Sequence, residues 1–216
     1  MNNAGDFLIN VSIWALPTIF AIILHEVMHG FVALRFGDDT ALRMGRLTLN
    51  PLSHIDLFGT IIMPAMLLFL HLPVFGYAKP VPVNFNRLRN PRFGMMIVAA
   101  AGPLTNIALA ILSALAMRVV ADFINAPWGG PHIADPLLRM LNASVLINII
   151  LAVFNLFPLL PLDGGRVLYT LLPQPAARAY ARLEPFGFLI LLVLLYTDSV
   201  EKVINPIISA IARVLL

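Results

Sequence analysis

Two histidines and a glutamate interrupt an apolar stretch near the start of the chain. His25, Glu26 and His29 form the pattern H-E-x-x-H. Residues four apart lie one above the other on a helix, so both imidazoles can bind one metal ion. Zinc accepts histidine nitrogen, and a glutamate beside the first ligand can take a proton from an attacking water. The pattern therefore predicts a metal site with Glu26 as general base.

The surroundings of this pattern strengthen the prediction. Residues 7–24 carry no charged side chain, and the sequence turns apolar again after His29. The alternative is a cluster of polar groups that only helps helices to pack. Ionisable groups inside an apolar membrane helix are costly and usually functional, so the setting favours metal binding.

A third metal ligand must come from elsewhere in the chain. Catalytic zinc sites normally have three protein ligands and one open position, and this chain has no cysteine. Asp163 is the best-placed acid, because Pro158 and Pro161 interrupt the helix before it and Gly164 lets the backbone approach a neighbour. Asp163 could instead, or also, cap the helix that follows. The rival ligands are His54 and Asp56.

The elements that position these residues are membrane helices. Of 216 residues 60% are hydrophobic and 12% are charged, whereas water-soluble domains have about a quarter charged residues. Apolar runs long enough to cross a bilayer occupy residues 7–24, 57–78, 93–117, 140–162, 176–196 and 200–216. We therefore expect an all-α polytopic membrane protein with about six spans, forming one domain over 1–216. The net charge is +3, and the lysines and arginines lie beside the apolar runs. We therefore expect the lipid bilayer, and no nucleic acid, as a partner.

The distribution of lysine and arginine predicts an orientation. Basic residues gather in 35–46, 87–92 and 166–182, whereas the 122–135 loop is acidic. The positive-inside rule places the basic clusters, and with them the metal site, on the cytoplasmic side of the cell membrane. If 57–78 crossed the membrane once, the basic 87–92 cluster would lie outside. We therefore expect 57–78 to be re-entrant, which requires shielding by protein or water.

Residues 43–50 are open to two interpretations. Leu47 and Leu49 alternate with polar residues between Gly45 and Pro51, which is typical of a short strand. An amphipathic loop explains the same pattern equally well.

Three motifs together resemble the site-2 protease family of intramembrane zinc metalloproteases. They are HEVMH at 25–29, AAGPLTN at 100–106, and N-x-x-P-x-x-P-x-D-G at 155–164. The resemblance covers about 7–172, which would be the catalytic core, and leaves two C-terminal helices in 176–216. We expect no PDZ or CBS domain in these 216 residues, which makes the sequence similar to the short members of the family.

The resemblance implies roles for individual residues. His25, His29 and Asp163 would bind one zinc ion per chain, and Glu26 would be the base. Membrane-spanning proteins would be the substrates. Residues expected to line the substrate cleft or to support it are Asn155, Asn106, Gly45, Leu47 and Leu49, the last three in a re-entrant strand that pairs with an unwound substrate.

Two other functions fit part of the pattern. A metal transporter would also place histidines and acids within spans, but it would string several polar sites along a path, whereas this chain has one cluster and one distant aspartate. An inactive relative would bind membrane partners without cleaving them, and the intact Glu26 argues against it.

Overall fold

The computed structural model describes residues 4–71, 76–124 and 131–216, and every regular element within them is helical. The α-helices are α1 (Ala4–Arg35), α2 (Thr40–Arg43), α3 (Met63–Phe69), α4 (Pro91–Ile124), α5 (Pro131–Asn155), α6 (Asp163–Leu171), α7 (Gln174–Ala181), α8 (Gly187–Tyr196) and α9 (Ser199–Leu215). Shorter turns of helix are η1 (Pro51–His54), η2 (Leu57–Ile62), η3 (Phe85–Arg87) and η4 (Glu184–Phe186).

Four helical segments are long and apolar enough to cross a membrane. They are Val11–Arg35, Pro91–Phe123, Asp135–Asn155 and Gln174–Tyr196, the last made of α7, η4 and α8. Large apolar side chains on α1, such as Trp14, Leu16 and Phe20, are about half exposed, as expected for a surface that faces lipid rather than water. The prediction of a helical multi-pass membrane protein is confirmed.

Two of the six predicted spans, 57–78 and 200–216, are not among the four candidate spans of the described residues. The apolar stretch that begins at residue 57 forms only η2, of 6 residues, and α3, of 7 residues. Together they rise about 20 Å, which is less than the roughly 30 Å of a hydrocarbon core. At the other end of the chain, α9 has 17 residues and carries Glu201, Lys202 and Arg213. It is shorter than each of the four candidate spans.

The segment after α3 returns to where η2 began. The Tyr77 amide donates to the Gly59 carbonyl (3.1 Å), and the Lys79 amide donates to the His54 carbonyl (2.8 Å). Residues 77–79 therefore lie beside residues 54–59.

The strand interpretation of residues 43–50 is wrong for the described chain, where no strand forms. A strand needs a second backbone to pair with, and no described segment pairs with this one. Residues 40–43 instead form α2, and residues 46–50 lack regular structure.

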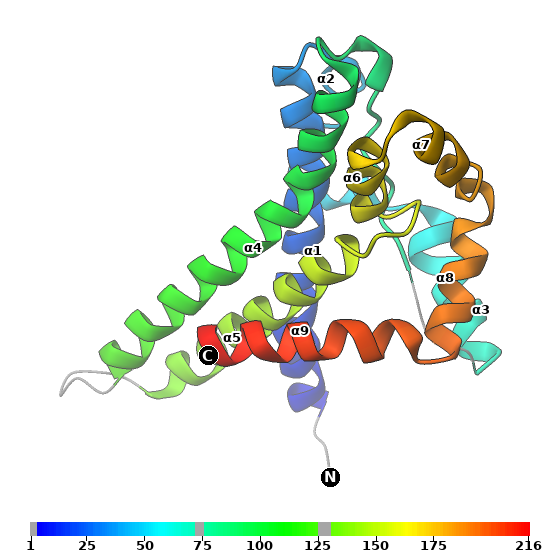
Figure 1. The fold of residues 1–216 in the computed structure, drawn as a ribbon. Coiled ribbons are helices and arrows are strands. Elements are labelled where there is room, and N and C mark those ends of the chain that lie inside the picture. The colour runs from blue at the N-terminus through cyan, green and yellow to red at the C-terminus, as the bar shows by residue number, and fades with distance from the viewer. Residues whose placement is uncertain (1–3, 72–75, 125–130) are drawn as a thin grey trace.

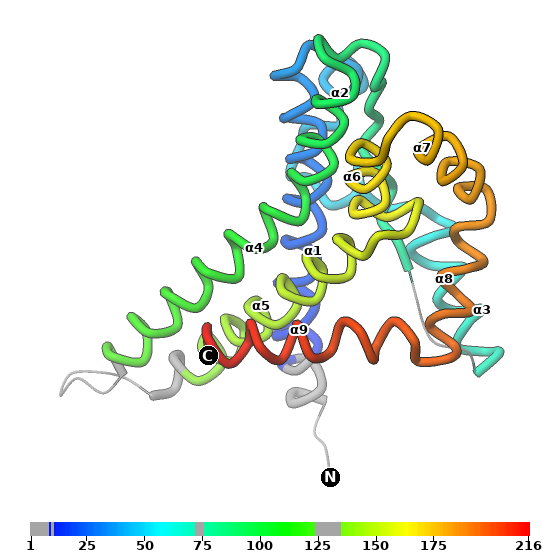
Figure 2. The backbone as a smooth tube through the Cα atoms, in the orientation of Figure 1, coloured from blue at the N-terminus to red at the C-terminus, as the bar shows by residue number. Residues whose placement is uncertain are grey.

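Helices α1, α4 and α5 form the centre of the molecule. Figure 1 shows α1 and α4 side by side near the end of α1 and the start of α4, from where they diverge, while α5 runs back toward the centre; the backbone tube in Figure 2 follows the same path. Small residues bring these helices together, because they let backbones approach closely. Fully or almost fully buried alanines include Ala21, Ala33, Ala110, Ala114 and Ala152.

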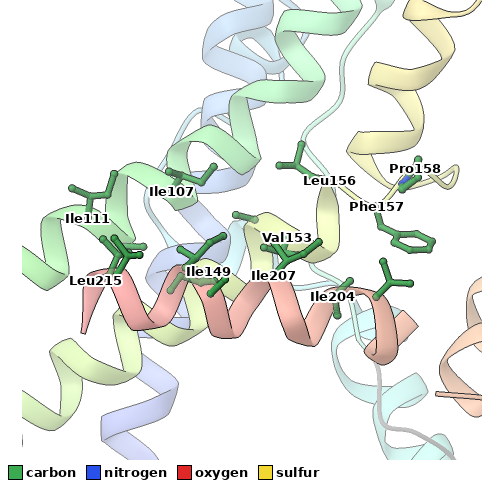
Figure 3. A pocket seen from close by; sticks show the side chains of 16 residues that line it. Ile107, Ile111, Ile149, Val153, Leu156, Phe157, Pro158, Ile204, Ile207 and Leu215 are labelled. Carbon is green, nitrogen blue, oxygen red and sulfur yellow. The ribbon is translucent and has the colours of Figure 1, made fainter. Parts of the chain in front are cut away.

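Helix α9 runs crosswise to α1 and covers α5 (Figure 1). Between α4, α5 and α9 lies an apolar pocket of about 670 Å³, lined by residues such as Ile107, Ile149, Val153, Ile207 and Leu215 (Figure 3). None of the predicted metal ligands lines this pocket, so the chemistry of the protein lies elsewhere.

Candidate metal centre

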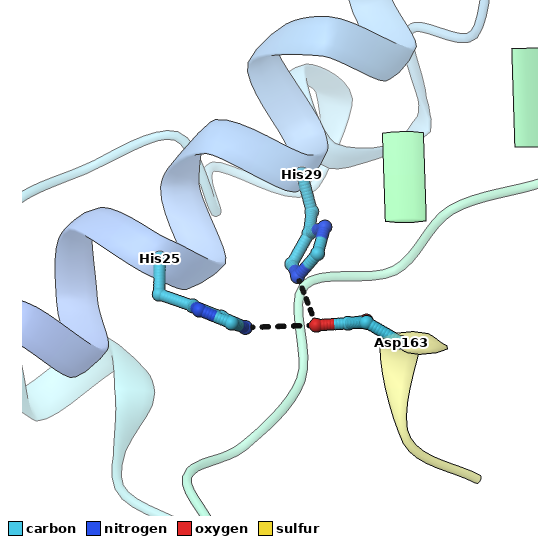
Figure 4. Close-up of side chains that lie close together, drawn as sticks. All are labelled: His25, His29 and Asp163. Atoms are coloured by element: carbon cyan, nitrogen blue, oxygen red, sulfur yellow. Dashed lines mark ion pairs between the residues drawn. The ribbon is translucent and has the colours of Figure 1, made fainter. Parts of the chain in front are cut away.

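Three potential metal ligands from two helices converge. His25 and His29 project from α1 toward Asp163, the first residue of α6 (Figure 4). Asp163 Oδ2 lies 3.1 Å from His25 Nε2 and 3.3 Å from His29 Nε2. The three side chains are only 8%, 12% and 16% exposed in the order His25, His29 and Asp163. His25 and Asp163 are 138 positions apart in the sequence, and the fold brings them into one buried group.

Each imidazole makes a hydrogen bond through Nδ1, on the side away from Asp163. This bond determines which nitrogen carries the proton and which one faces Asp163 with a lone pair. His29 Nδ1 lies 2.7 Å from the Val98 carbonyl oxygen. A carbonyl only accepts, so Nδ1 of His29 carries the proton. His25 Nδ1 lies 2.6 Å from Asn106 Oδ1, which assigns its proton in the same way.

The orientation of Asn106 is itself determined by its neighbours. Asn106 Nδ2 donates to the Ala21 carbonyl (3.3 Å) and to Asn148 Oδ1 (2.8 Å), which leaves Oδ1 to accept from His25. Asn148 is oriented in turn, because its Nδ2 donates to the Ser144 carbonyl (2.8 Å). Asn106 and Asn148 are 0% and 1% exposed. A buried chain of amides thus orients His25.

The converging atoms suit a metal cation. With both protons on Nδ1, the two Nε2 lone pairs and the Asp163 carboxylate oxygen face one another without a hydrogen atom between them. Asp163 Oδ2 is buried and has no hydrogen-bond partner among the described residues. Such a group of electron-pair donors is unfavourable unless a cation lies among them. Two imidazoles and one carboxylate are a ligand set that catalytic zinc uses.

Helix α4 provides the space for this group. Val98, Gly102 and Asn106 follow one another at intervals of four, so they share one face of α4. A Cβ at Gly102 would lie 2.6 Å from His25 Nε2 and would also overlap His29. Glycine is therefore required where α4 passes close to both Nε2 atoms. Gly102 lies between the two residues of α4 that accept hydrogen bonds from the imidazoles.

Asp163 is positioned by close backbone packing at the start of α6. A Cβ at Gly164 would overlap the Leu156 carbonyl, and one at Gly165 would overlap the backbone of Leu159. At the other end of α6, the Arg92 guanidinium donates to the Thr170 carbonyl (2.8 Å) and to the Leu172 carbonyl. Helix α6 is thereby tied to the turn before it and to α4.

The rival ligands make other contacts. His54 Nε2 lies 2.9 Å from the Thr48 carbonyl oxygen, and the Asp56 side chain accepts from the Gly59 amide (2.7 Å) at the start of η2. Within the described chain, the acids and histidines close enough to share a metal are His25, His29 and Asp163.

The remaining predicted site residues lie around the group in different ways. Glu26 Oε2 accepts from the Val81 amide (2.8 Å). Asn155 ends α5, and its Nδ2 donates to the Leu151 carbonyl one turn earlier (2.9 Å). Gly45 has a φ of +62°, which favours glycine. Leu47 is partly buried, and Leu49 is 56% exposed.

Three contributors were missed in the sequence. The carbonyl of Val98 and the backbone amide of Val81 carry no side-chain signal, so composition could not reveal them. Asn148 had a signal, because it is an amide within the apolar run 140–162, and polar residues inside spans usually bond across helices.

This fold and this site define the class of protein: a helical membrane protein with a buried His-His-Asp group beside a glutamate. Comparison with known proteins agrees. A family model described as peptidase family M50 matches residues 116–196. The chain is 35% identical over 200 residues to YwhC of Bacillus subtilis, covering 89% of this chain and 84% of YwhC. It is 32% identical over 204 residues to Rip2 of Mycolicibacterium smegmatis, covering 94% and 72%.

Both relatives are described as candidate zinc metalloproteases. The zinc metalloprotease MJ0392 of Methanocaldococcus jannaschii is 26% identical over 174 residues, covering 79% of this chain and 38% of that protein. No solved structure matches at a significant level. The chain belongs to peptidase family M50 and is a short, site-2 protease-like zinc metalloprotease, which confirms the predicted family, enzyme class and metal.

Proposed function

We propose that this chain hydrolyses peptide bonds within or near the membrane-spanning segments of other proteins. The observation that carries the proposal is the convergence of His25, His29 and Asp163 within a helical membrane protein, with Glu26 next to the first histidine. A membrane helix hides its amides in its own hydrogen bonds, so cleavage requires water and a metal at membrane depth.

His25, His29 and Asp163 are the residues that would hold zinc. When bound, zinc lowers the pKa of a coordinated water to about 7 and polarises the scissile carbonyl. Glu26 takes the proton from the attacking water and passes it to the leaving amine. Asn155 lines the cleft: its side-chain amide has two N–H donors, and the one not used by Leu151 can donate to the carbonyl oxygen as charge develops.

The segment 45–50 offers a place for the unwound substrate. The amides and carbonyls of Leu47 and Leu49 make no hydrogen bond with other described residues. In an extended chain, the backbone groups of residues i and i+2 point to the same side. We propose that the substrate adds to this edge as a strand, with Gly45 forming the turn before it.

The orientation of the protein follows from its basic residues. Hydrogen bonds from Arg92 to α6 and an ion pair between Arg87 and Asp39 (2.8 Å) place the three basic clusters near one another. The positive-inside rule assigns this end to the cytoplasm. The return of residues 77–79 to residues 54–59 supports a re-entrant path for 57–78.

The proposal is tested with Glu26→Gln in purified protein reconstituted with a panel of single-span membrane proteins. Glutamine keeps the size of the side chain but does not accept the proton, and general bases contribute about 10²–10⁴-fold in rate. We expect normal zinc content and cleavage at least about a hundredfold slower. Asp163→Ala is the companion variant and should lose zinc. Equal cleavage by the parent and Glu26→Gln proteins would show that Glu26 is not the base.

A further inference from the structure

An extended segment crosses α1 beside the metal centre. Residues 77–84, here called the strap, form no helix or strand. Near its start, Lys79 donates its amide to the His54 carbonyl (2.8 Å), and its carbonyl accepts from Arg46 Nη2 (2.9 Å). At its end, the Asn84 amide donates to Asp38 Oδ2 (2.6 Å). Both ends of the strap are therefore anchored.

The anchors are buried polar residues that the metal centre does not use. Arg46, His54 and Asp38 are 8%, 3% and 1% exposed. Burying such groups is costly unless they make hydrogen bonds. Arg46 and Asp38 contact the strap with their side chains, and His54 contacts it with its backbone carbonyl. The hydrogen bonds that hold the strap therefore offset part of the cost of burying Arg46 and Asp38.

The middle of the strap meets Glu26. The Val81 amide donates to Glu26 Oε2 at 2.8 Å. Pro80 and Pro82 flank Val81 and have no N–H, so Val81 supplies the one amide donor among these three residues. The two prolines also restrict the backbone around it.

Packing fixes the height of Val81 along α1. Its side chain is 7% exposed. A Cβ at Gly30, one turn after Glu26, would lie 2.7 Å from Val81 Cγ1. The absence of a side chain at Gly30 thus lets the strap approach α1 at the level where the Val81 amide reaches the carboxylate.

We propose that the backbone amide of Val81 is a positioning group for the general base. It holds Oε2 of Glu26, so that the carboxylate keeps one rotamer and Oε1 stays free to take the proton of the attacking water. The inference rests on the role of Glu26 in the proposed function. Productive geometry requires supporting contacts of this kind, because a freely rotating carboxylate is seldom in place.

The test removes the N–H and keeps the side chains. Val81→Pro eliminates the donor, and so does replacement of Val81 by its α-hydroxy analogue, which turns the amide into an ester with little change in shape. We expect unchanged zinc content, an unchanged KM, and a kcat about tenfold to a hundredfold lower, as is usual for groups that orient an active-site residue.

Val83 provides the matched control. It also follows a proline, and its amide makes no hydrogen bond with other described residues. Val83→Pro and the α-hydroxy analogue at Val83 should leave kcat near the parent value. An equal loss at both positions would overturn the inference, because the amide of Val81 would then have no special role. The ester variant decides the matter if Val81→Pro does not fold.

A double-mutant cycle separates positioning from general damage. If the Val81 amide acts through Glu26, removing it should change the residual rate of the Glu26→Gln protein less than about twofold. A full loss in both backgrounds would overturn the inference. A higher kcat in the Val81 ester variant would also overturn it, because the strap would then obstruct the active site instead of supporting Glu26. Normal cleavage by Glu26→Gln alone would instead refute the proposed function.

Discussion

At the scale of single residues, the metal centre depends on groups that never touch the metal. Asn106 Oδ1 accepts a hydrogen bond from His25 Nδ1, and the Val98 carbonyl accepts one from His29 Nδ1. These contacts turn both Nε2 atoms toward Asp163. Hydrogen-bonded neighbours of this kind fix the tautomer and the orientation of a metal ligand.

We therefore predict that Asn106→Leu weakens zinc binding about tenfold to a hundredfold, because His25 loses the group that orients it. Competition with a chelator in detergent solution measures the affinity. Thr105→Val is the control, since Thr105 Oγ1 bonds only within α4, to the Ala101 carbonyl. The explanation fails if the two variants bind zinc equally well.

At the scale of elements, the site is assembled by contacts between helix ends and irregular segments. The start of α6 packs directly against the turn that follows α5. The strap is anchored to His54 of η1 and to Asp38 in the loop between α1 and α2. The anchor at Asp38 has a charge that responds to pH. Burial alone would raise the pKa of Asp38, but hydrogen bonds from Thr40 and from the Asn84 amide, with Arg87 nearby, hold the pKa below its ordinary 3.8.

A lowered pKa in the folded state stabilises the protein above the unfolded-state value, and this stabilisation is lost as the pH falls through the folded-state value. We expect Asp38→Asn to be less stable than the parent at pH 6 by about 1–3 kcal/mol, because the Asn84 and Thr40 donors lose a charged acceptor. Unfolding in detergent at several pH values measures this difference. The difference should shrink below about pH 4, and a constant gap down to pH 3 would contradict this assignment.

At the scale of the whole molecule, the metal centre lies near the end where the basic clusters meet. Arg87 forms an ion pair with Asp39 at the start of α2, and Arg92 donates to the Thr170 carbonyl near the end of α6. Contacts between α1, α4, α5 and α6 hold this end together, while the far ends of α1 and α4 diverge (Figure 1). The metal centre therefore lies nearer to this end of the molecule than to the far ends of α1 and α4.

The absence of cysteine makes orientation easy to test. Single cysteines at Asn90 and Pro175 should react with a membrane-impermeant maleimide from the cytoplasmic side, and a cysteine at Gly130 from the outside, because lysine and arginine favour the cytoplasm. Position 130 lies outside the described residues. Labelling of position 90 from outside would refute the re-entrant path of residues 57–78.

The sequence alone determined the class of protein and the atoms of its chemistry. Long apolar runs predict membrane helices because the bilayer excludes unpaired backbone groups. His25 and His29 meet because helical periodicity is local, and Asp163 stands out because prolines and glycines break the helix around it. The same local rules predict spans at 57–78 and 200–216, where the described residues form shorter helices. Apolar character alone does not reveal where a helix ends.

Only the tertiary structure decided which contacts complete the site. The histidines of α1 bond to Val98 and Asn106, and Asn106 bonds to Asn148, all across tens of residues. The Val81 amide lies 55 positions from Glu26. Backbone donors and acceptors are the same at every position, so no residue type marks the amide or carbonyl that a fold will use. Their roles arise from helix packing, which brings distant segments within hydrogen-bonding distance.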